Sequence, residues 1–407
     1  MCLFNDLPNE LLCQVAEFLP TGAVHALALT SRKLKRVSYP VLYKKISLPI
    51  PIEKPKQEDH RILLFARTLT ARPDFADGIT GLDVSVRTDH PDMISTDINI
   101  GAMRALGASI IETIPDTLPL GSQRNNKAWL QRLFDLDNLA WLGLLLYMLP
   151  SLETLYARFL GRTLEGKHYI GSGALENLFV APKMDFSLVP GLCGLKELGL
   201  QCRKASGEWC YLPKLERMWL DQKVKFVQHN QSRPSLSVTE LSMVLSTEVL
   251  SPRVTNQILG FSGFWKPSPF AVLRRLNIDL DNVLRFLGTM KPADIIREGH
   301  YTQGAARMLS AQLKPLAHTL EELHLTVANG TDSQFLDHVG PFPVGTLTTF
   351  RKLKVLWLPQ ALLLPRDLIP RPELIQDNEP LTVDDTFFPT TLRSLRFSTR
   401  PRRFIAG

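Results

Sequence analysis

The sequence predicts an α/β protein in which a small N-terminal domain of three helices precedes a solenoid with parallel strands on its concave face and helices outside. Two observations support this prediction. The first is an N-terminal segment with helical periodicity, "LPNELLCQVAEFLP" at residues 7–20. The second is a motif of the form L-x-x-L-x-apolar, which recurs along the rest of the 407 residues as "LKELGL", "LEELHL" and "LRSLRF".

In residues 7–19 the apolar side chains follow one another mostly at steps of three and four, which places them in one wide stripe on a helix. Pro8 suits the first helical position, and Pro20 and Gly22 end the helix. A second helix is expected over "AVHALALT". Thr30 or Ser31 can cap a third helix, which we expect Pro40 to break.

Three short helices in about 40 residues bury little surface, so this domain is not robust alone. The stripe on the first helix is wider than two short neighbours can cover. It therefore either stays available to another protein or packs on the rest of the chain, and the pattern alone does not decide between these two.

The N-terminal segment resembles an F-box, and the trailing "YPVLYKKISL" is similar to the F-box ends common in fungal proteins. The residues that match the family pattern are Leu7-Pro8, Glu10, Leu11-Leu12, Val15, Phe18-Leu19, Leu27, Leu29 and Ser31-Arg32. The resemblance implies docking to the Skp-family adaptor of cullin–RING ubiquitin ligases. The adaptor contacts that it implies are Leu7, Pro8, Leu11, Leu12, Val15 and Leu19.

Domain boundaries follow from composition. We expect an F-box at residues 1–48 and a linker at residues 49–60, where proline and charge are concentrated. We expect a repeat domain that binds the substrate at residues 61–407. Leu82 and Val84 are the expected inward residues of its first strand.

The second apolar position of the recurring motif falls at Leu155, Leu178, Leu198, Met218, Leu241, Leu276, Leu323, Leu356 and Leu395. The first four gaps are 23, 20, 20 and 23 residues, as in leucine-rich repeats. The later gaps of 35, 47, 33 and 39 residues predict longer helices or surface insertions, with a helical pattern before "EELHLTV". This body resembles the irregular leucine-rich repeats that follow F-boxes in many fungal proteins.

Alternation along each strand predicts which residues point away from the core. If Leu155 points in, Tyr156 points out, and the same logic exposes Phe179, Trp219, Asn277, His324, Trp357 and Arg396. We take Tyr156, Phe179, Trp219, His324 and Trp357 as substrate-binding candidates, because aromatic residues dominate binding hot spots. Phe261, Phe264 and Trp265 are further loop aromatics. The alternative is that long insertions fold over this face.

Composition and charge favour a protein partner over nucleic acid or membrane. The formal charge of +7 is spread thinly, with no long block of like charge. The longest apolar run, Leu139 to Leu149, is shorter than the ~20 residues that span a bilayer, so we expect a buried helix. No secretory signal is visible, and five scattered cysteines suit a reducing compartment. The expected location is the cytoplasm, the nucleus or both.

No catalytic, cofactor or metal site is expected. "GRTLEGKH" at residues 161–168 lacks the hydroxyl residue that a phosphate-binding P-loop needs after its lysine, and a loop between repeats is expected there. The histidines and cysteines show no zinc spacing. The predicted function is therefore a non-enzymatic substrate-recognition subunit of an SCF-type E3 ubiquitin ligase. The alternative is an interaction scaffold of the same architecture that acts outside ubiquitin ligation.

Overall fold

The structure is a computed structural model of the chain. It describes residues 7–49, 61–87, 100–112, 123–162, 168–170, 172–173, 175–179, 185–202, 204–221, 225–227, 237–246, 270–281, 310, 313–327, 347–359 and 388–397. The chain forms two compact units, which are described separately. Unit 1 holds residues 1–200 and 212–214, and unit 2 holds residues 201–211 and 215–407.

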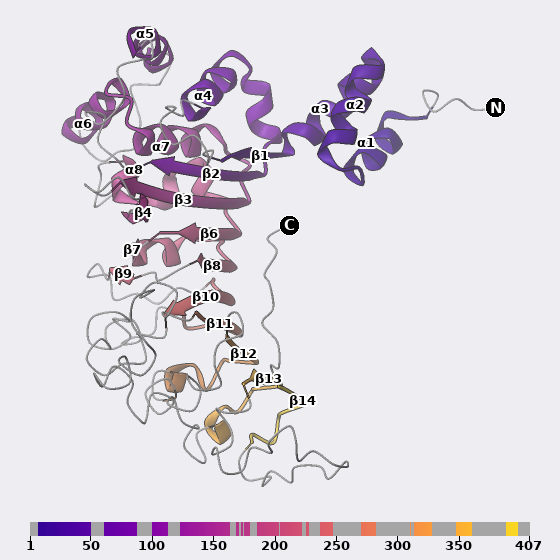
Figure 1. The fold of residues 1–407 in the computed structure, drawn as a ribbon, viewed down its shortest axis with the longest axis vertical. Helices are drawn as coiled ribbons and strands as arrows, with labels where there is room; N and C mark the ends of the chain where they lie inside the picture. The colour runs from indigo at the N-terminus through magenta and orange to yellow at the C-terminus, as the bar shows by residue number, and fades with distance from the viewer. Residues whose placement is uncertain are drawn as a thin grey trace, which may run out of the picture. The chain divides into compact units, whose positions relative to one another are not determined.

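Unit 1 begins with three short helices, α1 (Asn9–Glu17), α2 (Thr21–Thr30) and α3 (Arg32–Lys44), as the sequence predicts (Figure 1). Ser31 caps α3, because its hydroxyl accepts a hydrogen bond from the backbone N–H of Leu34 at 3.2 Å. Between α1 and α3, the side chains of Leu12, Leu34 and Val37 form a small core.

Two prolines behave differently from the prediction. Pro8 precedes the helix instead of opening it, since its ψ of 148° is extended while its carbonyl accepts the first helical bond from Leu12 N–H. Pro40 lies inside α3 and does not end it. The helix continues because Tyr39 and Tyr43, on either side of Pro40, pack on Phe75, with a ring distance of 4.7 Å between Tyr43 and Phe75. These contacts offset the backbone hydrogen bond that proline cannot donate.

The segment after α3 joins the main sheet of unit 1. Strand β1 (Lys45–Leu48) pairs in parallel with β2 (Gly81–Arg87), and Ile46 lies opposite Leu82. Leu82 and Val84 are buried as predicted, but β1 and not β2 is the first strand of the sheet. The helical pattern before β2 forms α4 (Arg61–Ala71) and the 3₁₀ helix η2 (Pro73–Gly78).

The sheet of unit 1 continues with β3 (Thr154–Arg162) beside β2 and β6 (Glu197–Gln201) beside β3. The intervening helices are α5 (Ile100–Ile111), α6 (Gln123–Phe134), α7 (Asn138–Met148), α8 (Glu176–Phe179), η4 (Phe186–Leu188) and α9 (Pro190–Cys193). Figure 1 shows α4, α5, α6 and α7 on one side of β1, β2 and β3. Strands on one side and helices on the other agree with a solenoid like that of leucine-rich repeats.

Helix α7 is the centre of the unit 1 core and confirms the predicted buried helix. All its residues from Leu139 to Leu146 are buried. Two buried tryptophans, Trp129 in α6 and Trp141 in α7, have satisfied indole N–H groups. Trp129 donates to the Leu178 carbonyl at 2.8 Å, and Trp141 donates to the Leu133 carbonyl at 3.2 Å. The helix also approaches the backbone of α9 closely, because a Cβ on Gly191 would lie 2.3 Å from the Leu146 carbonyl oxygen.

Unit 2 contains strands β7 (Lys204–Ser206), β8 (Arg217–Asp221), β9 (Lys225–Val227), β10 (Glu240–Ser246), β11 (Arg275–Asp281), β12 (Glu322–Val327), β13 (Val355–Leu358) and β14 (Ser394–Phe397). From β8 to β14, with β9 excepted, the strands lie side by side in chain order and run parallel (Figure 1). Short 3₁₀ helices η5 (Gly207–Tyr211), η8 (Lys314–Leu316) and η9 (Leu347–Thr349) precede β8, β12 and β13.

The predicted repeat positions of unit 2 lie opposite one another. Met218 faces Leu241, Leu241 faces Leu276, and Leu276 faces Leu323. Leu323 then faces Leu356, which faces Leu395. These side chains form a continuous apolar row, so the irregular spacing in sequence conceals a regular repeat in space.

One repeat position was predicted wrongly. Leu178 lies in α8 and not in a strand, because "ENLF" packs as a helical turn against α7. β3 and β6 are neighbours in the sheet, so the repeat between them is longer than the gaps of 20 and 23 residues suggested. Most of the helical pattern predicted before β12 lies outside the described residues, and its last part is η8. Among the described helices, none is long and apolar enough to span a bilayer.

Candidate protein-interaction surfaces

Three apolar side chains of α1 lie in a row on its exposed side. Leu11, Val15 and Phe18 follow at steps of four and three, and they are 45%, 37% and 89% exposed. Leu29, near the end of α2, is 75% exposed, and Leu19 is 36% exposed. We call Leu11, Val15, Phe18, Leu19 and Leu29 the apolar ridge.

The opposite side of α1 holds the domain together. Leu12 and Ala16 are fully buried, and Leu12 packs in the core with Leu34 and Val37. The expectation that Leu12 is available to an adaptor is therefore wrong, because α3 covers it. Leu7 is half-buried against the same core, whereas Pro8 is exposed.

The ridge is unusual for this chain. Of the eight large hydrophobic side chains that are exposed in the described part of the chain, five belong to the ridge, which spans residues 11–29. Scattered apolar residues on a surface are normal, but a contiguous group marks an interaction site. The adaptor contacts predicted from the sequence do not include Phe18 and Leu29, although the positions of both residues in the apolar pattern could have indicated them.

Polar contacts fix the helices that carry the ridge. Lys44 at the end of α3 pairs with Glu17 at the end of α1 at 2.8 Å. Lys33 donates to the carbonyl of Leu7 at 2.8 Å. Both contacts are exposed and contribute little energy, but they join the two ends of α1 to α3.

A family model identifies this region. The F-box-like domain matches residues 4–49. The match covers α1, α2, α3 and β1, and it includes every residue of the apolar ridge. A comparison of the chain with curated proteins gives no match. F-box domains typically bind Skp-family adaptors, so the F-box-like domain supplies the expected class of partner for the ridge.

A second candidate surface is the open face of the sheet in unit 2. One lateral row of this face carries side chains that alternate with the buried leucines, as predicted. The row runs through Trp219, Ser242, Asn277, His324, Trp357 and Arg396. Trp219, Asn277, His324 and Trp357 are half-buried, and Arg396 is exposed.

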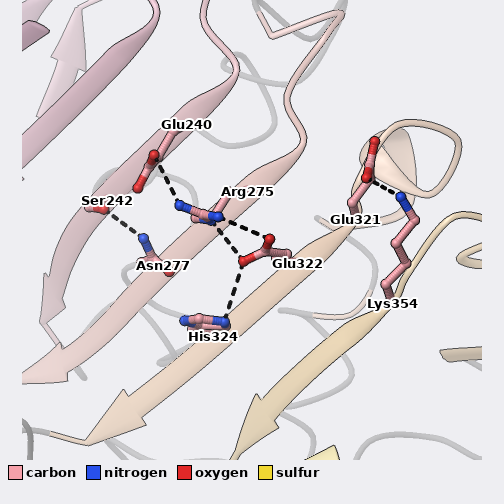
Figure 2. Close-up of polar contacts among 8 residues, drawn as sticks. All are labelled: Glu240, Ser242, Arg275, Asn277, Glu321, Glu322, His324 and Lys354. Atoms are coloured by element: carbon pink, nitrogen blue, oxygen red, sulfur yellow. Dashed lines mark hydrogen bonds and ion pairs between the residues drawn. The ribbon is translucent and has the colours of Figure 1, made fainter. Parts of the chain in front are cut away.

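Aromatic and amide contacts connect this row. The His324 and Trp357 rings lie 5.6 Å apart, and the guanidinium of Arg396, on β14, lies 6.0 Å from the Trp357 ring centre. The Asn277 amide donates to the Ser242 hydroxyl at 2.9 Å (Figure 2). Trp357 is thus held between a histidine and an arginine, an arrangement that limits its rotamers before any partner binds.

A second row on the same face consists of charged residues, which lie two positions earlier along each strand than Ser242, Asn277 and His324. Arg275 reaches Glu322 at 2.8 Å and Glu240 at 3.4 Å, and His324 lies 3.9 Å from Glu322 (Figure 2). The Arg275 hydrogen bond is the main reason that the pKa of Glu322 is lowered. In turn, the hydrogen bond to Glu322 is the main reason that the pKa of Arg275 is raised. The face is therefore polar, charged and aromatic, unlike the apolar ridge.

In unit 1 the outward position of Tyr156 agrees with the prediction, since Tyr156 is half-buried between the buried Leu155 and Ala157. Its ring covers Gly199 of the neighbouring strand, where a Cβ would lie 2.1 Å from the ring. The Arg158 guanidinium lies 5.1 Å from the Tyr156 ring centre. Gly199 thus lets Tyr156 lie flat across the sheet.

The outward position predicted for Phe179 is wrong. Phe179 lies in α8, is 1% exposed and packs between Trp129 and Phe186, with ring distances of 6.3 Å and 6.0 Å. The alternation rule failed because this segment is helical. The three aromatics Phe261, Phe264 and Trp265 lie outside the described residues.

The two ends of the segment compared with a P-loop lie on neighbouring strands. Gly161 and Arg162 end β3, and His168 begins β4 (His168–Ile170), which runs antiparallel to β3. A P-loop instead leads from a strand into a helix whose N-terminus faces the phosphate. Within the described residues, no group of three or more histidine, cysteine, aspartate or glutamate side chains could hold a metal ion.

Proposed function

We propose that this protein is the substrate-recognition subunit of an SCF-type cullin–RING E3 ubiquitin ligase. The apolar ridge carries this proposal, because it is exposed and lies entirely within the F-box-like domain. In this function the domain binds a Skp-family adaptor and, through it, a cullin. The repeat body binds a protein target, and the chemistry of ubiquitin transfer belongs to the partners.

The adaptor site in this proposal consists of Leu7, Pro8, Leu11, Val15 and Leu19, extended by Phe18 and Leu29. Leu12 supports the site from the core. Full burial of one such apolar side chain contributes about 1.5–3 kcal/mol. A few exposed anchors of this size are enough to dominate the affinity of an interface.

The target site in this proposal is the open sheet face. Within unit 2, Trp219, His324 and Trp357 support it, because they are partly exposed and the His324 and Trp357 rings contact each other. Tyr156 is a separate candidate on the sheet of unit 1. We infer that the repeats are of the irregular leucine-rich kind that follows F-boxes in fungal proteins. Holding a target there raises its effective concentration near the ubiquitin-loaded enzyme. We retain residues 1–48, 49–60 and 61–407 as the proposed F-box, linker and target-binding domain.

The decisive experiment changes one ridge residue and one matched control. Leu11→Asp places a charge in the proposed interface without touching the core, and it should weaken adaptor binding by about 3 kcal/mol, or roughly a hundredfold. Leu64 in α4 is 37% exposed and lies outside the F-box-like domain, so Leu64→Asp is the control. Binding to a purified Skp-family adaptor is measured by calorimetry for both variants.

Unchanged binding by Leu11→Asp would refute the docking site. Equal loss in the Leu64→Asp variant would show that the effect is not local. Purification of the wild-type complex adds a second readout, since adaptor without cullin would favour the scaffold alternative over a ligase subunit.

A further inference from the structure

Charged residues that immediately precede several strands form a ladder along one edge of each unit, which Thr80 and Thr239 interrupt. In unit 1 these residues include Glu153 before β3 and Lys196 before β6. In unit 2 the final four are Arg274, Glu321, Lys354 and Arg393, before β11, β12, β13 and β14. Backbone hydrogen bonds place them side by side: Lys354 N–H donates to the Glu321 carbonyl at 2.7 Å, and Arg393 N–H donates to the Lys354 carbonyl at 2.8 Å.

Among the residues just named, three neighbouring pairs have opposite charge. Lys196 pairs with Glu153 at 2.7 Å in unit 1. In unit 2 Lys354 pairs with Glu321 at 2.5 Å, and Arg274 lies 4.0 Å from the same carboxylate (Figure 2 shows the Lys354 pair). The pattern breaks at Arg393, whose neighbour Lys354 carries the same charge. Like charges on adjacent strands are unfavourable unless an anion lies between them.

A surface hollow of about 370 Å³ lies at this break. Its lining residues are Glu321, Arg351, Lys352, Lys354, Thr390, Thr391, Leu392 and Arg393. Four cations and one carboxylate give the lining a net charge of +3 (4 − 1). Within the described part of unit 2, Arg351, Lys352 and Arg393 make no ion pair.

The single carboxylate does not neutralise the hollow. Glu321 is already paired with Lys354, which is the first cause of its lowered pKa, and Arg274 and Lys352 lower that pKa further. It therefore stays ionised at neutral pH and serves to hold the Lys354 ammonium in place. The charge that remains uncompensated belongs to Arg351, Lys352 and Arg393.

We propose that this hollow binds a compact oxyanion of the phosphate class. Arginine guanidinium groups and lysine ammonium groups are the side chains that bind phosphate oxygens best. The exposed Thr390 adds a hydroxyl donor. Thr391 donates its hydroxyl to the Leu353 carbonyl at 2.9 Å and so helps to order the turn that carries Arg393.

The lining also limits the size of the ligand. Among the described residues that line it, none has an aromatic side chain on which a base could stack, and Leu392 alone is apolar. A nucleotide is therefore a poor fit. The phosphate group either is free inorganic phosphate or belongs to a phosphorylated side chain of another protein. This inference stands independently of adaptor docking, because every lining residue belongs to unit 2.

The test uses the full chain and three probes at constant ionic strength. The probes are inorganic phosphate, a capped Gly-phosphoserine-Gly peptide and the same peptide without the phosphate. The double variant Arg351→Gln/Arg393→Gln removes two lining cations. The control Lys214→Gln/Lys314→Gln removes two exposed cations that lie outside the hollow. Dissociation constants are measured by calorimetry, and circular dichroism verifies folding.

The proposal expects at least a tenfold rise in the Kd for phosphate in the lining variant and less than a twofold change in the control. Glu321→Gln raises the net charge of the lining and should lower the Kd, which provides a second test if the double variant does not fold. Wild-type affinity in the lining variant, an equal loss in the control, or an unchanged Kd in Glu321→Gln would overturn the site. So would equal binding of the unphosphorylated peptide.

The first two probes distinguish the sources. A site for a phosphorylated protein binds the phosphopeptide at least as tightly as inorganic phosphate. A site for the free ion binds inorganic phosphate more tightly, because the peptide substituent occupies one oxygen.

Discussion

Leu12 packs against Leu34 and Val37, while its neighbour Leu11 projects from the other side of α1. We therefore expect Leu12→Ala to destabilise the F-box-like domain by about 2–5 kcal/mol, the usual cost of a cavity in a core. Leu11→Ala should change stability by less than about 0.5 kcal/mol, since surface substitutions rarely do more.

Hydrogen exchange over residues 9–44, measured by mass spectrometry, gives the free energy of opening for both variants. Equal protection in the two variants would contradict the assignment of Leu12 to the core and Leu11 to the surface.

The same pair of residues shows what a sequence can predict at this scale. Periodicity places Leu11 and Leu12 on one wide apolar stripe. Because this stripe is wider than the surface that α2 and α3 can cover, periodicity alone does not show which of its edges α3 covers. The distinction depends on where Val37 lies in space. Phe179 failed for a related reason: its burial depends on Trp129 and Phe186, which lie 50 residues before it and seven after it.

At the scale of elements, two contacts of Asp137 fix the start of α7. The Asp137 carboxylate accepts the N–H of Leu139 at 2.8 Å and pairs with Arg132 at 2.6 Å, and both charged side chains are only about one quarter exposed. The preceding Leu136 adopts a positive φ of 59°, a conformation that costs energy in a residue other than glycine. Asp137 thus fixes a tight connection between α6 and α7.

Asp137→Ala should destabilise unit 1 by about 1–2 kcal/mol or more, because it removes a helix cap and the carboxylate that pairs with Arg132. Urea unfolding followed by tryptophan fluorescence measures this change, since Trp129 and Trp141 flank the connection. Asp77→Ala, at an exposed position in η2, is the control. A loss in the control as large as that in Asp137→Ala would contradict the capping role.

Other elements were harder to predict. The pattern around Pro40 predicted a break, and local propensity does favour one. The break is absent because Tyr43 stacks on Phe75 and Tyr39 meets the same ring edge-on, and Phe75 lies more than 30 residues away. Similarly, "KISL" is too short to read as a strand, and it becomes β1 only because β2 presents an edge beside it.

At the scale of the whole molecule, the parallel repeat architecture was predictable because each motif places apolar residues at the same positions. Leu241, Leu276, Leu323, Leu356 and Leu395 occupy one lateral row although 33 to 47 residues separate them. Repeats of this kind are stabilised mainly by their neighbours. Their register therefore follows from the motif, whereas the intervening segments carry no comparable signal.

The cysteines offer a probe of local unfolding in each of the two units. Cys193 in unit 1 is exposed, whereas Cys202 and Cys210 in unit 2 are buried. Burial raises the pKa of Cys210 to about 12, which suppresses the thiolate, the species that reacts with alkylating agents. At pH 8 we expect iodoacetamide to modify Cys193 quickly and Cys202 and Cys210 only when unit 2 opens.

Mass spectrometry of peptides after timed labelling measures these rates. If Cys210 reacts as fast as Cys193 under native conditions, the assignment of Cys210 to the buried interior is wrong.

The raised pKa of Cys210 also predicts how the stability of unit 2 depends on pH. Because the unfolded thiol ionises near its ordinary value of 9.0, the stability that the neutral buried thiol contributes is complete below that pH and is lost as pH rises toward 12. Labelling of Cys202, which is also buried in unit 2, should therefore accelerate over this range, and Cys210→Ala should reduce the acceleration.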